Sequence, residues 1–168
     1  GIEKRAKGPE TFMKNLLKTE FLFDEREHAE EKVRSILDYF LQTHLVSAPV
    51  EKDAFKITRM GFDRLPIWAS LNKTFMESYW IATKALGHQK NLALKEDALL
   101  KKMSYLGKRF HKLGVVDHVG ALSKLNFTNA VAVIKRDFLR RRPDKEQEPL
   151  EVLSHLSQRI YELSRYGQ

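Results

Sequence analysis

The stretch L-P-I-W-A-S-L-N-K-T-F-M-E-S-Y-W-I-A-T-K-A-L (65–86) is the most informative for the fold. Apolar residues recur in it at intervals of three or four, which is the period of one helix face: Trp68, Leu71, Phe75, Tyr79, Ala82 and Leu86. We expect Pro66 in the first turn, where its missing N–H is tolerated, and Gly87 just beyond the last turn. The stretch therefore predicts a long helix whose apolar stripe faces a core.

A second amphipathic helix is predicted upstream, over residues 25–45. Asp24 is its expected N-cap, because a side-chain oxygen there can accept a hydrogen bond from the first turn. A shorter helix is expected before it, around residues 10–18. These two helices would form the N-terminal part of the chain.

Residues 46–60 change in character between the two long helices. Pro49 prevents the first helix from continuing, and Phe55 and Ile57 alternate with polar neighbours, which indicates a short β-hairpin. Gly61 then gives the backbone freedom before the second helix. The order helix, hairpin, helix is typical of a winged-helix module.

Downstream, a polar connector (87–94) leads to a third helix that Gly114 ends. Its apolar residues are in helical register: Leu99, Met103, Leu106, Phe110 and Leu113. Two further helices are predicted over 121–125 and 128–140, with a tight join at Asn126.

A charged linker bounded by prolines (141–149) precedes a final amphipathic helix that begins at Leu150 and ends near Gly167. The predicted fold is mainly α, with one small β-hairpin and winged-helix-like elements. We expect a winged-helix-like subdomain over 1–90 and a helical subdomain with a basic face over 91–168, which could pack as one domain.

The composition indicates a globular chain, since 42% of its 168 residues are hydrophobic. It contains no cysteine, which excludes disulfides, thiolate metal sites and a cysteine nucleophile, and which fits a reducing compartment. No apolar run approaches the roughly 18 residues that span a bilayer. Because Gly1 stands where a Met would start a protein, we expect a segment of a longer chain.

The formal charge of +8 is concentrated between residues 101 and 142, where eleven Lys and Arg residues face two Asp residues. Such an excess points to an acidic partner: phospholipid headgroups, nucleic acid or an acidic protein. The alternative is an ordinary solvated face, in which the final arginines complement a helix C-terminus.

Recognisable catalytic motifs are absent from the sequence. The glycines are scattered singly, so no phosphate-binding loop is predicted. The six histidines lie too far apart for a local metal site. Ser78 and Ser123 lack the context of an activated nucleophile, and Glu77 is interpreted as a helix residue that caps or pairs with a neighbouring element. We therefore predict no catalytic, metal-binding or cofactor-binding residues.

Three segments in order carry a family resemblance: E-S-Y-W (77–80), G-K-R-F-H-K-L-G (107–114) and A-L-S-K-L-N-F-T-N-A (121–130). Together they resemble the C-terminal region of the membrane-associated glycerol-3-phosphate acyltransferases. That family's catalytic His and Asp, separated by four residues, have no counterpart: His111 and Asp117 are nearest and have the wrong spacing. Taken singly, Tyr79, Trp80 and Phe110 are interpreted as core residues, as is Phe127.

The resemblance implies a non-catalytic C-terminal domain of a phospholipid-biosynthesis enzyme, which supports the enzyme's fold, assembly or membrane association. Its expected partners are the parent's catalytic domain and an anionic membrane surface, and its expected location is cytoplasmic, peripheral to the membrane's inner face. Five basic residues are the candidate membrane contacts: Lys135, Arg136, Arg140, Arg141 and Arg142.

A nucleic-acid-binding protein is the alternative. The helix predicted before Asn126 and the basic helix after it can be drawn as a helix-turn-helix. However, base-reading residues lie near the N-terminus of such a recognition helix, and here the arginines lie at its far end. Nucleic acid is therefore the less favoured partner.

Overall fold

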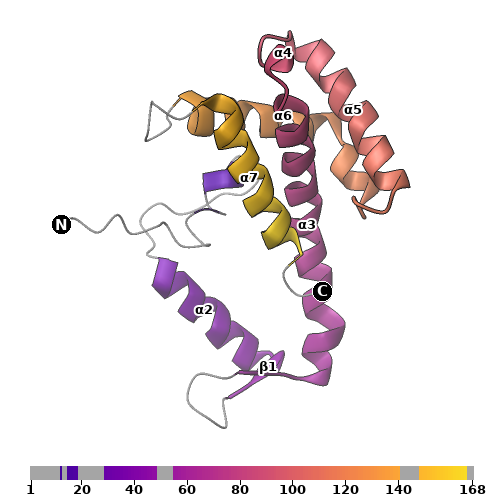
Figure 1. Cartoon of the computed structure of the whole chain (residues 1–168). Coiled ribbons are helices and arrows are strands. Elements are labelled where there is room, and N and C mark those ends of the chain that lie inside the picture. The colour runs from indigo at the N-terminus through magenta and orange to yellow at the C-terminus, as the bar shows by residue number, and fades with distance from the viewer. Residues whose placement is uncertain (1–11, 13–14, 19–28, 49–54, 141–147, 166–168) are drawn as a thin grey trace, which may run out of the picture. The chain divides into compact units, whose positions relative to one another are not determined.

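The computed structural model describes residues 12, 15–18, 29–48, 55–140 and 148–165. Residues 10, 11, 13 and 14 of the predicted N-terminal helix lie outside these residues, as do Asp24, Pro49 and residues 141–147 of the linker, whereas residues 12, 15 and 16 are described and helical. The described chain is mainly α-helical with one two-stranded hairpin, which confirms the predicted fold class (Figure 1). No helix in the described part is long and apolar enough to cross a membrane.

The chain forms two compact units, residues 1–71 and 72–168, and the long helix α3 (Arg59–Leu86) contributes to both. The sequence-based division at residue 90 stays a prediction. Unit 1 (1–71) contains helix α2 (Ala29–Gln42), strands β1 (Val46–Ser47) and β2 (Lys56–Ile57), and the first half of α3.

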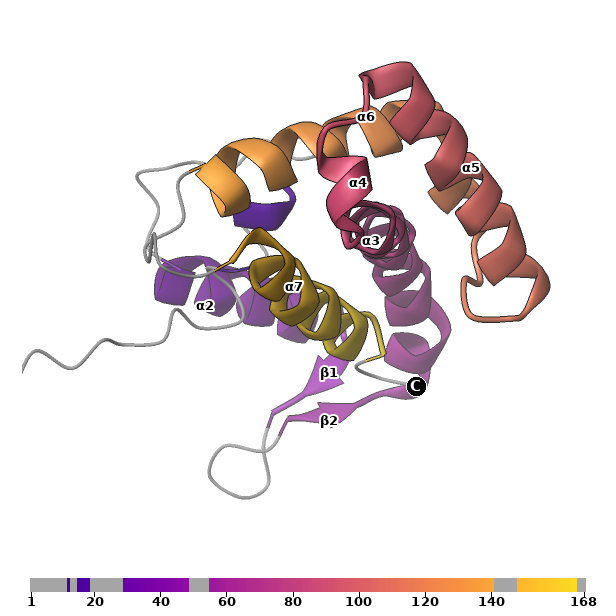
Figure 2. The same ribbon diagram turned by 45° about the horizontal axis from the view of Figure 1, so that its top comes forward.

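The predicted hairpin connects α2 to α3. Its strands pair antiparallel, with Val46 opposite Ile57 and Ser47 opposite Lys56 (Figure 2). The order helix, hairpin, helix predicted from the sequence is therefore present in unit 1.

Helix α3 begins at Arg59, earlier than the predicted start near Pro66, which instead lies inside the helix. Thr58 explains the early start. Its Oγ1 accepts a hydrogen bond from the Gly61 N–H at 3.1 Å and lies 2.6 Å from the His44 carbonyl oxygen. Because this hydroxyl both caps the first turn and contacts the turn that follows α2, the helix starts directly after strand β2.

Gly61 has a different role from the one predicted. It lies buried in the first turn of α3, where a Cβ would overlap the carbonyl oxygen of Leu45 and approach Ile57 Cγ2 to 2.8 Å. The glycine is needed because the helix approaches the backbone of the hairpin, not because the chain bends there.

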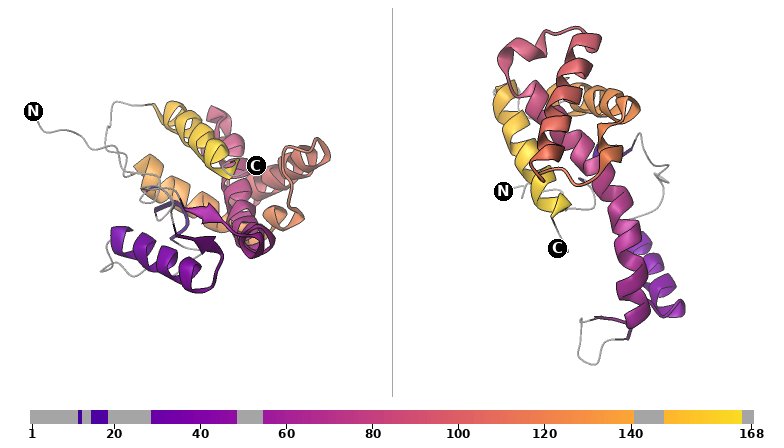
Figure 3. Two further views of the ribbon diagram at one scale, coloured as in Figure 1. Left: turned by 90° about the horizontal axis from the view of Figure 1, so that it is seen from below. Right: turned by 90° about the vertical axis from the view of Figure 1, so that its right-hand side faces the viewer.

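Part of the predicted apolar stripe of α3 is exposed. Trp68 stacks on Tyr39 of α2 at a ring-centroid distance of 6.2 Å and lies 5.9 Å from Phe40, yet it stays 42% exposed. Leu71 is more exposed still, at 59%. The right-hand view of Figure 3 shows α2 beside the first half of α3, where Tyr39 and Phe40 contact Trp68.

Unit 2 (72–168) is built around the second half of α3. Helices α5 (Glu96–Lys112), α6 (Lys124–Val133) and α7 (Pro149–Ser164) surround it, as the view along α3 shows (Figure 2). The core side chains come from all four helices and are almost completely buried: Tyr79, Ile81, Leu86, Leu99, Met103, Phe127, Leu153 and Ile160.

The connector before α5 contains one short helix, α4 (Gln89–Leu92), where the sequence predicted only a polar linker. The Asn91 side chain accounts for this turn: Nδ2 donates to the Ala85 carbonyl oxygen at 2.6 Å, and Oδ1 accepts from Lys102 Nζ at 2.9 Å. Asn91 is buried and thus joins the end of α3 to α5.

Helix α5 ends as predicted, with Gly114 in the left-handed region at φ +68°. Leu113 was predicted to face inward but is exposed. It is the C-cap residue, so it lies beyond the last helical turn and its side chain is not on the buried face of α5. The predicted break at Asn126 is also wrong. A 3-10 turn, η1 (Val119–Leu122), precedes α6, and α6 runs through Asn126 into a π-helix, η2 (Ile134–Arg140).

Candidate functional site

Glu77 lies on α3 within unit 2 and holds the segment that follows α5. Its buried carboxylate accepts hydrogen bonds from the backbone N–H groups of Asp117 at 2.8 Å and His118 at 3.0 Å. His118 Nδ1 lies 3.3 Å from the same carboxylate. The carboxylate therefore pairs with a neighbouring element, as the sequence indicated. We call this arrangement the Glu77 clamp.

Lys73, one turn earlier on α3, contacts the same segment through a hydrogen-bonded ion pair with Asp117. This hydrogen bond from Lys73 lowers the pKa of Asp117 below its ordinary value. The second half of α3 thus holds residues 117 and 118 from two successive turns. Both contacts lie inside unit 2.

Ser78 is used structurally. Its Oγ lies 2.8 Å from the carbonyl oxygen of Ala121 and 3.0 Å from that of Thr74. Asn126 Nδ2 donates to the Gly120 carbonyl oxygen at 3.3 Å and lies 3.5 Å from Ser78 Oγ. No base contacts this hydroxyl among the described residues. Ser78 therefore connects α3 to η1 and α6 through hydrogen bonds.

Trp80 completes the E-S-Y-W segment as a core residue beside Tyr79, which is fully buried. The Trp80 ring lies 4.9 Å from the Phe110 ring and 5.8 Å from the Tyr161 ring, and Lys84 Nζ lies 5.4 Å above it. Aromatic pairs at these distances stabilise a core beyond their buried area. The interpretation of Trp80 as a packing residue is confirmed.

Gly107, inside the second motif, is a functional packing residue that the sequence reasoning missed. A Cβ at this position would overlap Leu122 Cδ2 and approach Ile81 Cδ1 to 3.3 Å and Phe127 Cζ to 3.5 Å. The glycine therefore lets α5 approach both α3 and η1. An isolated glycine inside a helical pattern was the available signal.

The histidines form no metal site among the described residues, since no three potential ligands come together there. His111 Nδ1 lies 2.9 Å from the Val116 carbonyl oxygen, and His118 belongs to the Glu77 clamp. These two side chains therefore help to fix the turn that follows α5.

The predicted basic contacts are only partly described. Lys135, Arg136 and Arg140 lie on η2, whereas Arg141 and Arg142 fall outside the described residues. Arg136 donates to both carboxylate oxygens of Asp137 at 2.9–3.1 Å, and this hydrogen bonding raises the pKa of Arg136. Lys135 is half-buried and Arg140 is exposed. Of the described arginines in the cluster, Arg136 already has a carboxylate partner.

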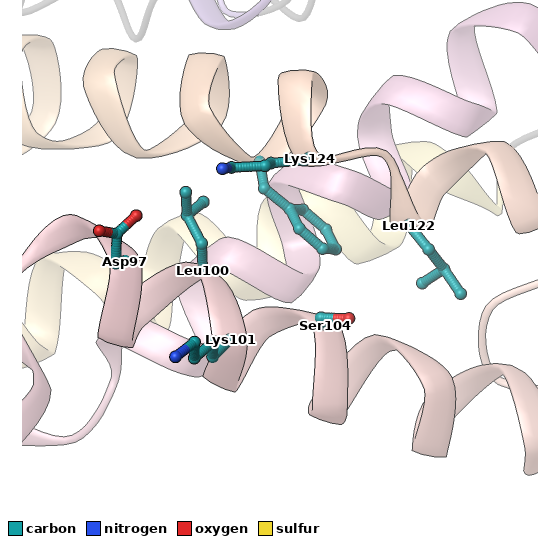
Figure 4. Close-up of a pocket in the computed structure, with 7 residues that line it drawn as sticks. Asp97, Leu100, Lys101, Ser104, Leu122 and Lys124 are labelled. Carbon is teal, nitrogen blue, oxygen red and sulfur yellow. The ribbon is translucent and has the colours of Figure 1, made fainter.

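A cavity of about 360 Å³ opens between α5 and the η1–α6 segment of unit 2 (Figure 4). Three of its lining residues are apolar and four are polar or charged: Leu100, Leu122 and Phe127, with Asp97, Lys101, Ser104 and Lys124. Its lining residues lie on α5, η1 and α6, which are the elements that carry the second and third motif segments. The packing of these elements against one another therefore forms the cavity.

A family model described as the glycerol-3-phosphate acyltransferase C-terminal region matches residues 10–141. The chain belongs to this family. Comparison with curated proteins and with solved structures found no match. The family assignment therefore rests on the sequence model, and it agrees with the three motif segments identified above.

Within this acyltransferase C-terminal region, the motif residues meet at one place. Glu77 binds the backbone between the second and third motifs, and Ser78 contacts the carbonyl oxygen of Ala121, the first residue of the third motif. Gly107 of the second motif lets α5 approach the side chains of Leu122 and Phe127 in the third. The helix-turn-helix drawn from the sequence is not formed, because Asn126 lies within α6 and no turn separates two helices there. The three motif segments, which are separated in sequence, therefore contact one another in the folded unit 2.

Proposed function

We propose that this chain is a non-catalytic supporting domain of a glycerol-3-phosphate acyltransferase and that it packs on the enzyme's catalytic region. Family membership supports the parent activity. The contacts of Glu77, Ser78 and His118 support a structural role, since the polar side chains of the motif are committed to holding backbone.

The observation that carries the docking proposal is an exposed apolar stripe on α3 in unit 1. Met60, Ile67 and Leu71 are 42%, 62% and 59% exposed. Their spacing of seven and four residues places them on one helix face. Exposed apolar side chains gathered on one helix face mark interaction sites in folded proteins. We call these three residues the α3 stripe.

Two further features describe the partner that the α3 stripe fits. Arg64 has the same helical phase, lies between Met60 and Ile67 in sequence, and is exposed, so the partner surface would be apolar with an acidic residue. On α2, Val33 and Ile36 are also exposed, at 41% and 43%. A catalytic region with an apolar docking face would cover these side chains.

The test uses a catalytic region of this family, produced without its own C-terminal region, and this chain added as a separate protein. We expect the two to copurify, and acyl transfer to glycerol 3-phosphate to increase when the chain is present. Ile67→Glu should abolish both effects, because it places a charge in the apolar interface. Ala69→Glu is the matched control, since Ala69 is exposed on the opposite side of the same helix.

Three results would contradict the proposal: no association, an equal loss with Ala69→Glu, or acyl transfer by the isolated chain.

Association with a membrane surface is a second part of the proposed role. Its support is the excess of basic residues between 101 and 142, and it is tested separately by vesicle binding.

A further inference from the structure

The cavity between α5 and α6 has the properties of a small-molecule site. Its volume of about 360 Å³ lies at the lower end of the range of about 300–1,000 Å³ typical of such sites. Phe127 and Leu100 form a buried floor, and Leu122 adds a half-buried aliphatic wall. The apolar part of the cavity is thus shaped by side chains that the core already fixes.

The charged groups lie at one end. Figure 4 shows the nitrogens of Lys101 and Lys124 and the carboxylate of Asp97 on one side of the cavity, with Leu122 on the other. Within the described part of the chain, neither lysine forms an ion pair. Two ammonium groups therefore remain available at the mouth of an apolar cavity.

We infer that this cavity binds a small amphipathic anion, with its negative charge near Lys101 and Lys124 and its apolar chain over Phe127 and Leu122. An ammonium group attracts an anion more strongly where an apolar wall reduces contact with water. The apolar chain gains by leaving water. The charged end and the apolar end of the cavity thus favour the same ligand, oriented with its anionic group toward the two lysines.

Asp97 sets the charge of that ligand. Two lysines and one aspartate leave a net charge of +1 at this end, which matches a single negative charge better than a double one. A free carboxylate and the phosphodiester headgroup of a lipid share this chemistry. The inference goes beyond docking on a catalytic region, because the α3 stripe lies in unit 1 and the cavity in unit 2.

The first experiment measures binding to the full chain by NMR titration and calorimetry. Octanoate represents a soluble carboxylate, and dihexanoyl phosphatidylglycerol represents a lipid phosphodiester. We expect the affinity to rise about fourfold for each methylene from butanoate to octanoate, as apolar burial predicts. Octylamine, octanol and inorganic phosphate should bind more weakly than octanoate, because each lacks one of the two features.

The second experiment uses variants chosen to keep the fold. Lys124→Glu should weaken octanoate binding about tenfold, and the new acid suits its place in the first turn of α6. Lys108→Glu is the matched control, because Lys108 is an exposed lysine on α5 that does not line the cavity. Asp97→Asn should strengthen binding of anions and reduce discrimination against octyl phosphate, which carries more negative charge.

Octanoate binding identifies a soluble anion as the source, and binding of phosphatidylglycerol alone identifies a lipid; either result supports the inference. Binding of neither anion overturns it, as does an equal effect of Lys108→Glu and Lys124→Glu. An affinity that does not change with chain length would also overturn it. If Lys124→Glu unfolds the chain, the gain expected from Asp97→Asn decides the matter.

Discussion

At the scale of single residues, the Glu77 carboxylate on α3 holds the backbone of the segment that follows α5. Replacing Glu77 with Gln removes an acceptor oxygen that faces a backbone N–H, so a part-buried donor loses its partner beside a buried side chain. We expect a loss of about 1–3 kcal/mol in the free energy of unfolding, measured by urea denaturation. Amide exchange of Asp117 and His118 should accelerate.

Glu96→Gln is the matched control for that experiment. Glu96 is exposed in the first turn of α5, so the same chemical change should alter stability by less than about 0.5 kcal/mol. An equal effect of the two substitutions would show that Glu77 does not hold the segment after α5.

The neighbouring pair of Lys73 and Asp117 predicts a pH dependence. Hydrogen bonding to Lys73 depresses the pKa of Asp117 below 3.8 in the folded state, so the folded protein binds a proton less readily than the unfolded one. The resulting stability is present above about pH 4 and is lost as the pH falls through the folded-state pKa.

Lys73→Met tests that dependence by removing the partner of Asp117. The variant should be less stable than the wild type near neutral pH, by about 1 kcal/mol at most because Asp117 is partly exposed. The difference should vanish in acid, as unfolding curves measured between pH 2 and 7 would show. A difference that stays constant over this range would contradict the assignment.

At the scale of elements, the close approach of α3 to the hairpin is the constraint that a substitution can break. Gly61→Ala improves helix propensity by about 1 kcal/mol, but its methyl group would overlap the Leu45 carbonyl oxygen. We expect a net destabilisation of about 1–3 kcal/mol, measured by thermal unfolding. Adding Ile57→Ala should not restore stability, because the tighter contact is with backbone; a full rescue would contradict this account.

How far the sequence predicts the elements can be seen in α3 and α6. Apolar periodicity predicted α3, but it placed the start near Pro66, because the signal for Arg59 is the Thr58 cap and its contact with the turn after α2. In place of α6, the sequence predicted two helices that meet at Asn126. Asn126 was interpreted as a break, yet its side chain binds the Gly120 carbonyl oxygen and is accommodated inside α6. These contacts join residues far apart or off the helical period, so a local pattern cannot contain them.

The candidate sites show the same limit. The sequence predicted that Glu77 pairs with a neighbouring element, but not which one, because the choice depends on how α5 ends relative to α3. The cavity could not be predicted at all, since its lining comes from two helices whose separation is set by Gly107. Periodicity identifies buried faces, whereas cavities depend on the residual space between them.

At the scale of the whole molecule, the basic excess remains a prediction about a membrane surface. Arg140 is exposed at the end of η2, and the two following arginines continue the cluster in sequence. Each basic residue near an anionic membrane contributes about 1 kcal/mol, so replacing all three arginines with Ala should weaken binding to phosphatidylserine vesicles by about a hundredfold.

Cosedimentation with anionic and with neutral vesicles measures this effect, and it should weaken as salt is raised. Replacing Lys56, Lys90 and Lys95 with Ala removes the same charge from exposed sites outside residues 101–142 and serves as the control. If the two triple variants lose affinity equally, the attraction reflects net charge and no membrane-facing surface is defined. If the arginine variant binds as the wild type does, the cluster is a solvated face, and docking on the catalytic region would have to hold the domain in place.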